Sequence, residues 1–107
     1  MSKNFKLLKI KIDYFNLLFN GKKNIEVRKL NKDYICLKDI VIFVDYQDYT
    51  YLGYGKVSYK NYFRYSGIIH DDSIDNFTKE FVIDNYHPDD LFVVFGFKKI
   101  YKIERSQ

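Results

Sequence analysis

Residues 21–28 of this chain have the sequence GKKNIEVR. It opens with a glycine, a residue well suited to end a helix, and its second half alternates apolar with charged side chains. Side chains along a β-strand point to alternate faces of the sheet, so Glu26 and Arg28 share one face, opposite to the apolar pair. The stretch therefore predicts a helix that stops at this glycine and a strand that follows directly, over residues 24–29.

Three charged residues of this stretch form a candidate site. Glu26 and Arg28 project from the same strand face, and Lys23, at the junction of helix and strand, reaches over that face. Two cations beside a carboxylate can neutralise a phosphate or polarise a carbonyl, and they lower the pKa of the carboxylate so that it stays ionised. On spacing alone, an ion pair on an exposed strand face, worth only about 0.2–1 kcal/mol, is the favoured explanation. Replacing Glu26 by Ala is then expected to cost little stability, whereas Val27→Ala on the apolar face is expected to cost about 1–3 kcal/mol.

The chain before this stretch predicts a strand and a short helix. Residues 5–12 alternate lysines with apolar side chains, a pattern typical of a strand. Asp13 is suited to cap the helix that follows. The apolar face of this helix carries Phe15, Leu18 and Phe19 at helical spacing, and this stripe is expected to pack in the core.

The chain after this stretch predicts further strands and a second helix. Apolar or alternating runs indicate strands over residues 39–45, 54–63, 91–97 and 99–104. Ser73 is suited to cap the second helix, which covers residues 73–86 and which Pro88 ends. Five or six strands with two helices predict an α+β fold with a small barrel-like sheet.

Length and composition bound the class of protein. With 107 residues, of which 47% are hydrophobic and 30% charged, the chain is expected to form one globular domain. Because no apolar run approaches the roughly 20 residues that a membrane helix needs, no membrane partner is expected. Cys36 is the only cysteine, and a small domain without disulfides is typical of a reducing compartment. A cytoplasmic location is therefore expected.

The formal net charge of +4 is unevenly distributed along the chain. Residues 1–38 hold ten Lys or Arg against three Asp or Glu, residues 39–95 hold four against ten, and residues 96–107 hold four against one. The two ends are therefore basic and the middle is acidic. If the ends lie side by side, they form one basic face suited to a polyanion. On charge alone, a solvated lysine-rich surface is the favoured explanation.

The octet matches the pattern Gly-x-Lys-x-x-Glu-x-Arg, and in it the sequence resembles the ASCH family of the PUA-like superfamily. Residues 34–43 look like the family's entry to a central strand, and residues 91–103 look like its closing strands, so the resemblance covers most of the chain. The family usually has a glycine before the aspartate that opens the central strand, whereas here Lys38 precedes Asp39. The resemblance implies a single ASCH/PUA-like domain over residues 1–107, in which the octet looks over a cleft between the first helix and the barrel.

The resemblance also implies a function. ASCH domains and their PUA relatives use this cleft for RNA or modified nucleobases, so we expect an RNA- or nucleotide-binding domain. A tyrosine-rich segment, residues 46–65, carries interleaved cations and offers further groups that stack on bases and contact phosphates. At least half of these tyrosines are expected to pack in the barrel. The candidate binding residues are Lys22, Asn24, Arg28, Lys56 and Tyr59.

Two enzymatic alternatives stay open. Some stand-alone ASCH domains are ribonucleases, and a small ribonuclease acting on single-stranded RNA would use the same octet, with a divalent metal as an optional cofactor. Small ASCH amidohydrolases act on N4-acylated cytidines with a Thr-Lys-Glu triad. Lys23 matches the lysine of that triad and Asp72 its acidic residue, but Glu26 stands where the threonine belongs and cannot act as a hydroxyl nucleophile. The catalytic candidates are therefore Lys23, Glu26 and Asp72, and the amidohydrolase ranks last.

The sequence predicts no resident cofactor and no metal site. His70 and His87 do not share a metal-binding spacing, and Cys36 has no second cysteine to pair with as a zinc ligand. A protein–protein role is a further alternative, because the family takes its name from a transcriptional coactivator. The oligomeric state is not predicted.

Overall fold

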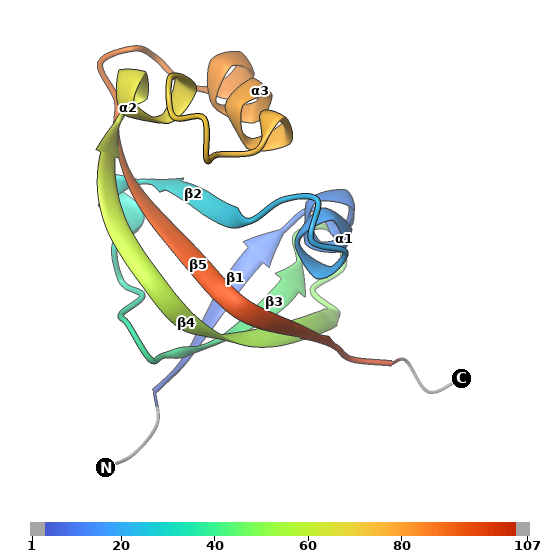
Figure 1. The fold of residues 1–107 in the computed structure, drawn as a ribbon. Helices are drawn as coiled ribbons and strands as arrows, with labels where there is room; N and C mark the ends of the chain where they lie inside the picture. The colour runs from blue at the N-terminus through green and yellow to red at the C-terminus, as the bar shows by residue number, and fades with distance from the viewer. Residues whose placement is uncertain (1–3, 105–107) are drawn as a thin grey trace.

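The structure, a computed structural model, describes residues 4–104 (Figure 1). It has five strands and three helices within this range, together with one short 3-10 turn, so the predicted α+β class is confirmed. Among these residues no helix is long and apolar enough to cross a membrane. In chain order the elements are β1 (Phe5–Ile10), α1 (Ile12–Phe19), β2 (Ile25–Lys29), η1 (Leu30–Lys32), β3 (Ile40–Asp45), β4 (Tyr51–Arg64), α2 (Tyr65–Ile69), α3 (Asn76–Asn85) and β5 (Leu91–Lys102).

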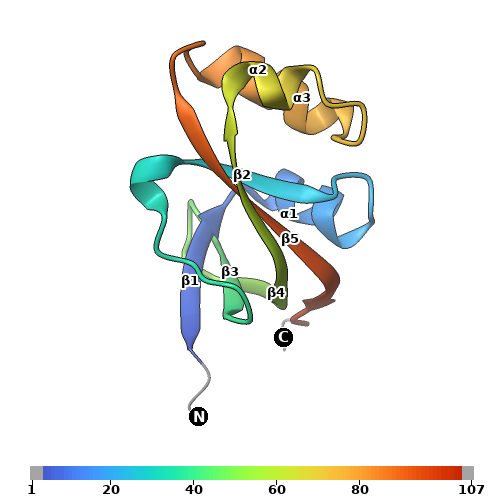
Figure 2. The ribbon, with the colours of Figure 1, turned by 60° about the vertical axis from the view of Figure 1, so that its left-hand side comes forward.

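The five strands form one mixed sheet in the order β1-β3-β4-β5-β2. β1 pairs with β3 in parallel, and the other neighbours pair antiparallel. The sheet curls into a half-barrel, which brings its two edge strands, β1 and β2, towards each other (Figure 2). No strand ladder joins these edges within residues 4–104. Instead, the Arg28 Nη2 atom on β2 donates a hydrogen bond of 2.8 Å to the Lys9 carbonyl on β1. The open side of the barrel is therefore a seam between β1 and β2.

The inside of the half-barrel is filled by side chains of the sheet and of α1. Val41 and Phe43, at alternate positions of β3, are fully buried, as the strand pattern predicts. Phe15 of α1 packs against Phe43 with ring centroids 5.5 Å apart. A Cβ atom on Gly53 of β4 would come within 2.5 Å of the Phe15 ring, so only glycine fits there. A second cluster of buried side chains joins α2 and α3 to β2 and β5.

The first helix differs in detail from the expected one. α1 begins at Ile12, and its capping residue, Lys11, makes no capping hydrogen bond with its side chain. Asp13, expected as the cap, lies in the first turn, where its charge is favourable to the helix dipole. Phe19, expected in the core, is 40% exposed, because this last residue of the short helix lies at the rim of the barrel. Gly21 has a φ angle of 76°, which confirms it as the residue that ends the helix.

The cap of the second long helix was also predicted at the wrong residue. α3 begins at Asn76, and the capping side chain is Asp75, which accepts a 2.8 Å hydrogen bond from the Thr78 amide. Asp75 also accepts from the Thr78 hydroxyl. Ser73, expected as the cap, instead donates its hydroxyl to Asp71 at 2.6 Å. Ser73 and Asp75 both fit a capping pattern. Asp75, whose carboxylate has two acceptor oxygens, is the residue that caps the helix.

The end of the chain forms one long strand where two were expected. β5 runs without a break from Leu91 to Lys102, so the boundary predicted between residues 97 and 99 is wrong. The pairing of β5 with β4 is nevertheless irregular at this point. Gly55 pairs with Ile100 but Val57 with Phe97, which leaves an extra residue in β5, and a second shift follows between Val57 and Tyr59 of β4. Bulges of this kind bend a strand and increase its twist, which helps the sheet to curl. The short helix α2, which directly follows β4, was not predicted.

Lys38 has an unusual backbone conformation. Its φ angle is 72°. This is the left-handed region of backbone conformation, which residues other than glycine, asparagine and aspartate seldom adopt. The residue precedes Asp39 in the turn that leads into β3, the position where the resembling family usually has a glycine. The turn therefore holds a lysine in a strained backbone conformation.

We expect Lys38→Gly to stabilise the protein by up to about 1 kcal/mol, because glycine removes a left-handed strain of roughly 1–2 kcal/mol at the cost of a more flexible unfolded chain. Lys56→Gly is the matched control: it replaces an exposed lysine inside β4, where glycine weakens a strand. Denaturant unfolding of both variants measures the difference. Equal destabilisation by the two substitutions would contradict the strain at Lys38.

Candidate functional site

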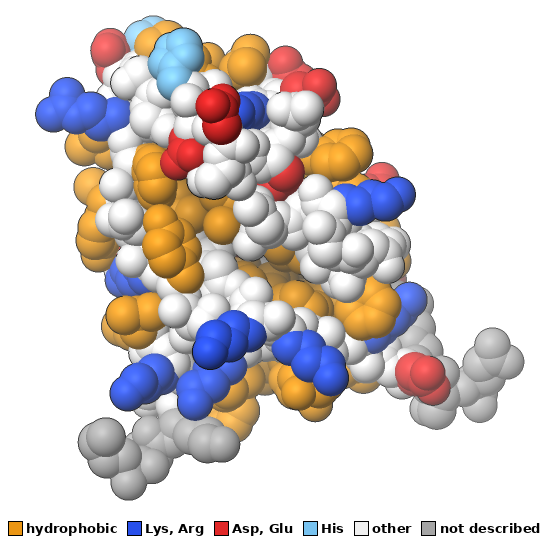
Figure 3. Space-filling view, in the orientation of Figure 1, with side chains coloured by type: hydrophobic (Ala, Val, Ile, Leu, Met, Phe, Trp, Pro, Cys, Tyr) orange, Lys and Arg blue, Asp and Glu red, His pale blue; other side chains and the backbone are white. Residues whose placement is uncertain are grey.

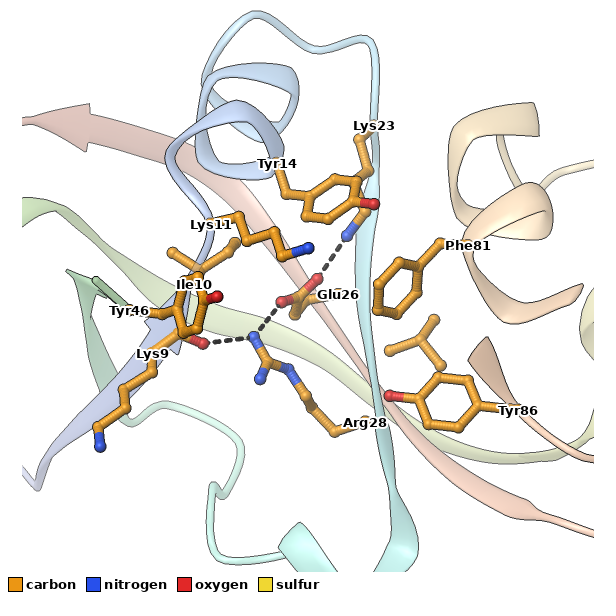
Figure 4. A pocket seen from close by; sticks show the side chains of 11 residues that line it. Lys9, Ile10, Lys11, Tyr14, Lys23, Glu26, Arg28, Tyr46, Phe81 and Tyr86 are labelled. Atoms are coloured by element: carbon orange, nitrogen blue, oxygen red, sulfur yellow. Dashed lines mark hydrogen bonds and ion pairs between the residues drawn. The ribbon is translucent and has the colours of Figure 1, made fainter. Parts of the chain in front are cut away.

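A cleft of about 240 Å³ lies at the seam between β1 and β2 (Figure 4). α1 borders it on one side and α3 with the segment after it on the other. The cleft therefore occupies the place where the sheet does not close, and its walls come from segments far apart in the sequence. The residues that line it are Lys9, Ile10, Lys11, Tyr14, Lys23, Glu26, Val27, Arg28, Tyr46, Phe81 and Tyr86.

The centre of the cleft is an ion network around one carboxylate. Lys23 Nζ donates a hydrogen bond to Glu26 Oε1, and Arg28 Nη2 donates to Glu26 Oε2. Lys23 and Glu26 are only 3% and 6% exposed. The structure brings these three side chains together on one face, as predicted. The exposed ion pair that spacing alone favoured is wrong, because this face is buried. The face is buried because Lys23 folds back over it and the helices border it.

Burial changes what a substitution at Glu26 costs. Glu26→Ala, expected to be nearly neutral, would leave the Lys23 ammonium inside the protein without its partner. Removing one member of a buried ion pair typically costs about 3–5 kcal/mol, because the remaining charge stays desolvated. Val27 is also buried, so both faces of β2 are covered at this point.

The ion network sets the protonation state of Glu26. Burial alone raises the pKa of a carboxyl group, but the charges of Lys23 and Arg28 and the hydrogen bonds they donate outweigh it, and together they lower the pKa of Glu26 from 4.5 to about 2. The carboxylate is therefore ionised at neutral pH, with both oxygens engaged. A group in this state holds cations in place and is poorly suited to take up a proton.

The cleft as a whole is cationic. Lys9, Lys11, Lys23 and Arg28 line it, and Glu26 is the one carboxylate among its lining residues, which gives a formal charge of +3. Figure 4 shows the Lys11 side chain directed across the cleft towards Glu26, while the Lys9 ammonium points away from it. Concave surfaces of one sign concentrate ligands of the opposite sign. The cleft therefore favours an anionic ligand.

Aromatic rings form the wall opposite Lys11. Tyr14 of α1 and Phe81 of α3 meet edge to face with ring centroids 5.1 Å apart, and Phe81 meets Tyr86 in the same way at 5.7 Å. Tyr86 in turn packs against buried Phe92 at 5.0 Å, which anchors the row of rings to the core. Burial also raises the pKa of the Tyr86 hydroxyl, so this group stays protonated as a hydrogen-bond donor. The cleft thus combines cations with a rigid aromatic wall.

The other predicted site residues lie outside this cleft. Asn24 and Tyr59 line a second cavity, of about 380 Å³, where Asn24 donates from its backbone to Asp75 and from its side chain to the Ser73 carbonyl. Asp72 is exposed and does not line the cleft. Lys22 and Lys56 are exposed and likewise do not line the cleft.

Several residues of the cleft were not among the predicted ones. Lys9 and Lys11 belong to an alternating run that was assigned to a strand, and Phe81 and Tyr86 belong to a segment assigned to a helix. Tyr46 lies in the tyrosine-rich segment but was not singled out within it. The alternation over residues 5–12 places Lys9 and Lys11 on the same face of the predicted strand. This pattern is the sequence feature that groups these two cations. Among residues 4–104 no three His, Cys, Asp or Glu side chains are grouped so as to hold a metal ion.

The fold of the chain is that of ASCH domains. No family model and no curated protein matches the sequence. A mutant of ZmASCH from Zymomonas mobilis has a similar structure, with a TM-score of 0.78 over 97% of this chain and 75% of that chain, at 9% identity. The ASCH domain from Lactobacillus crispatus gives a TM-score of 0.62 over 94% and 81%, at 11% identity. A protein from Enterococcus faecalis gives 0.64 over 100% and 86%, at 13% identity. The predicted ASCH-like, PUA-type fold is therefore confirmed.

Acid unfolding tests the ion network directly. Because the pKa of Glu26 is lowered on folding, the unfolded chain binds the proton more readily, and stability is lost as the pH falls from about 4.5 towards about 2. The contribution at neutral pH is on the order of 3 kcal/mol. Glu26→Gln lacks this contribution, so we expect it to be less stable than the wild type at neutral pH, by an amount that shrinks towards pH 2.

Denaturant unfolding across this pH range measures the effect. Asp84→Asn, at an exposed position of α3, is the control and is expected to follow the wild-type curve. A stability difference between Glu26→Gln and the wild type that does not change with pH would show that Glu26 is not held as an ion by its two partners.

Proposed function

We propose that this domain binds RNA by taking an unpaired nucleotide into the cleft at the seam between β1 and β2. The observation that carries the proposal is the pairing of three cations, Lys11, Lys23 and Arg28, with an aromatic wall in one cavity. Cations contact phosphates, and aromatic side chains stack on or pack against bases that are not base-paired. The cleft volume of about 240 Å³ lies just below the range of about 300–1,000 Å³ for drug-sized ligands, which suits one base-sized group.

The chemistry of the cleft supports binding over cleavage. A general base works best when its pKa lies near the operating pH, whereas the pKa of Glu26 is about 2 and both its oxygens accept hydrogen bonds from cations. No His, Ser, Thr or Cys is among the lining residues of the cleft. The proposal therefore gives Glu26 the role of holding Lys23 and Arg28, and ranks the ribonuclease and the amidohydrolase behind the binding domain.

Lys11 provides the first test. It is exposed, its side chain reaches over the cleft, and it does not belong to the buried network, so Lys11→Ala should leave the fold intact. Removing one lysine–phosphate interaction lowers the slope of log affinity against log salt by about 0.7 for single strands. We expect this decrease for Lys11→Ala with a labelled single-stranded RNA, measured by fluorescence anisotropy. Lys79→Ala on α3, outside the lining of the cleft, is the control and should keep the wild-type slope. An unchanged slope for Lys11→Ala would place the phosphate-binding groups elsewhere.

Glu26→Gln separates the binding domain from the ribonuclease. The substitution removes a negative charge from the cleft, so we expect RNA to bind equally or more tightly, provided that circular dichroism shows the variant folded. We also expect the wild type to leave the RNA intact, with or without divalent metal. Cleavage by the wild type that drops by about 10²–10⁴-fold in Glu26→Gln, the usual contribution of a general base, would instead establish a ribonuclease.

A further inference from the structure

The outer face of the sheet, on the side opposite the core, carries a row of four apolar side chains, three exposed and one, Ile42, half-buried. Leu7 of β1 pairs with Ile42 of β3, Ile42 with Tyr54 of β4, and Tyr54 with Tyr101 of β5. The row therefore crosses four neighbouring strands on one face. Leu7, Tyr54 and Tyr101 are 54%, 40% and 45% exposed. We call these four residues, together with Lys9, Lys56 and Lys99 beside them, the outer sheet face.

No described helix covers the outer sheet face. Figures 1 and 2 show α2 and α3 at the far end of the long strands and α1 at the mouth of the half-barrel, which leaves the lower part of β1, β3, β4 and β5 uncovered. Single exposed apolar side chains are ordinary on a protein surface, but a continuous row across four strands indicates an interaction surface.

Two of the rings on this face already form a stack. The Tyr54 and Tyr101 rings lie nearly parallel, with an interplanar angle of 15° and centroids 5.0 Å apart. The Lys99 ammonium lies 4.9 Å from the centroid of the Tyr101 ring. Partly exposed aromatic rings offer a flat surface on which unpaired bases can stack, because every base has a π-face. A cation beside the rings can contact the neighbouring phosphate.

The charged side chains of the outer sheet face are all cations. Two further rows of paired residues flank the apolar row. Lys56, opposite Ile40, lies in one of them, and Lys9, opposite Val44, lies in the other. No Asp or Glu belongs to these rows. Figure 3 shows the same separation: Lys and Arg side chains gather with hydrophobic ones over the lower strands, and acidic side chains gather over α2 and α3. The basic segments 1–38 and 96–107 meet where β2 pairs with β5, with Ile25 opposite Gly96. β1 and β5 are separated by β3 and β4, so the lysines of β1, β4 and β5 are spread across the sheet.

We propose that the outer sheet face is a second contact surface for single-stranded RNA, on which bases stack against Tyr54 and Tyr101 while Lys9, Lys56 and Lys99 contact phosphates. The inference rests on the proposed function of the cleft and extends the bound strand beyond it. A second protein chain is the less suitable partner, because the face has three lysines and no acidic side chain with which a copy of itself could pair.

The two surfaces are continuous through β1. Lys9 lines the cleft, and its ammonium lies 4.8 Å from the centroid of the Tyr49 ring, away from the cleft centre. One strand of RNA can therefore pass from the cleft over the β1 edge to the outer sheet face. Neighbouring strands lie about 4.8 Å apart, so the path from β1 to β5 adds roughly 14 Å. A bound RNA must be several nucleotides long to reach Tyr101.

RNA length separates the two surfaces in one experiment. The affinities of labelled single-stranded RNAs of about three and about twelve nucleotides are compared for the wild type, Tyr54→Leu and Tyr101→Leu. Loss of one base stack is expected to weaken the longer RNA by about fivefold or more and to leave the shorter one unchanged. Tyr54→Phe, which keeps the ring, should bind the longer RNA like the wild type. Lys11→Ala should weaken both RNAs, because both use the cleft.

The outcomes are distinguishable. If Tyr54→Leu and Tyr101→Leu bind the longer RNA as tightly as the wild type, the second surface is refuted while the cleft stands. A wild type that binds neither RNA contradicts both proposals. Sedimentation velocity tests self-association. If the wild type is a dimer and Tyr101→Leu is a monomer with unchanged RNA affinity, the outer sheet face is a self-association surface and the proposal is overturned.

Discussion

The buried carboxylate of Glu26 is the constraint on which the cleft depends. An ionised carboxylate inside a protein is costly unless it is paired and hydrogen-bonded, and here Lys23 and Arg28 each engage one of its oxygens. Arg28 also donates to the Lys9 carbonyl, so the side chain that neutralises Glu26 also joins the two edges of the sheet. Lys23 reaches the carboxylate from the turn after α1. One group thereby ties together the first helix and both edge strands.

This network explains why the seam is a cleft and not a further strand ladder. The carbonyl of β1 that faces the seam is bound by a guanidinium, and side chains occupy the space in which a neighbouring strand would lie. Because Glu26 neutralises only one of its two cationic partners, the network keeps a charge of +1, and Lys11 adds a further cation directed into the cleft. The aromatic wall is held by its contacts with the core through Tyr86 and Phe92. Charge and shape of the cleft thus follow from the way in which the half-barrel is closed.

Sequence patterns predicted the strands well and the burial of the site poorly. Alternation over residues 24–29 correctly placed Glu26 and Arg28 on one face, because that relation is fixed within three residues of one strand. The same alternation indicates exposure, since charged residues usually face water. This was wrong because Lys23, from the turn after α1, folds over Glu26, and α1 and α3 border the site. The cap at Asp75 was missed for a similar reason. Its carboxylate also accepts a hydrogen bond from the backbone amide of Asn24, a residue distant in the chain. Local spacing carries no information about such partners.

An NMR titration of the labelled protein with single-stranded RNA locates the bound ligand without any substitution. Backbone amides report their surroundings residue by residue, and Asn24 and Tyr59, in the second cavity, serve as internal references. RNA bound in the cleft is expected to cause saturable shifts at Lys11, Arg28 and Tyr86, which line the seam. Shifts confined to the second cavity, or to α2, with the seam residues unmoved, would contradict binding in the cleft.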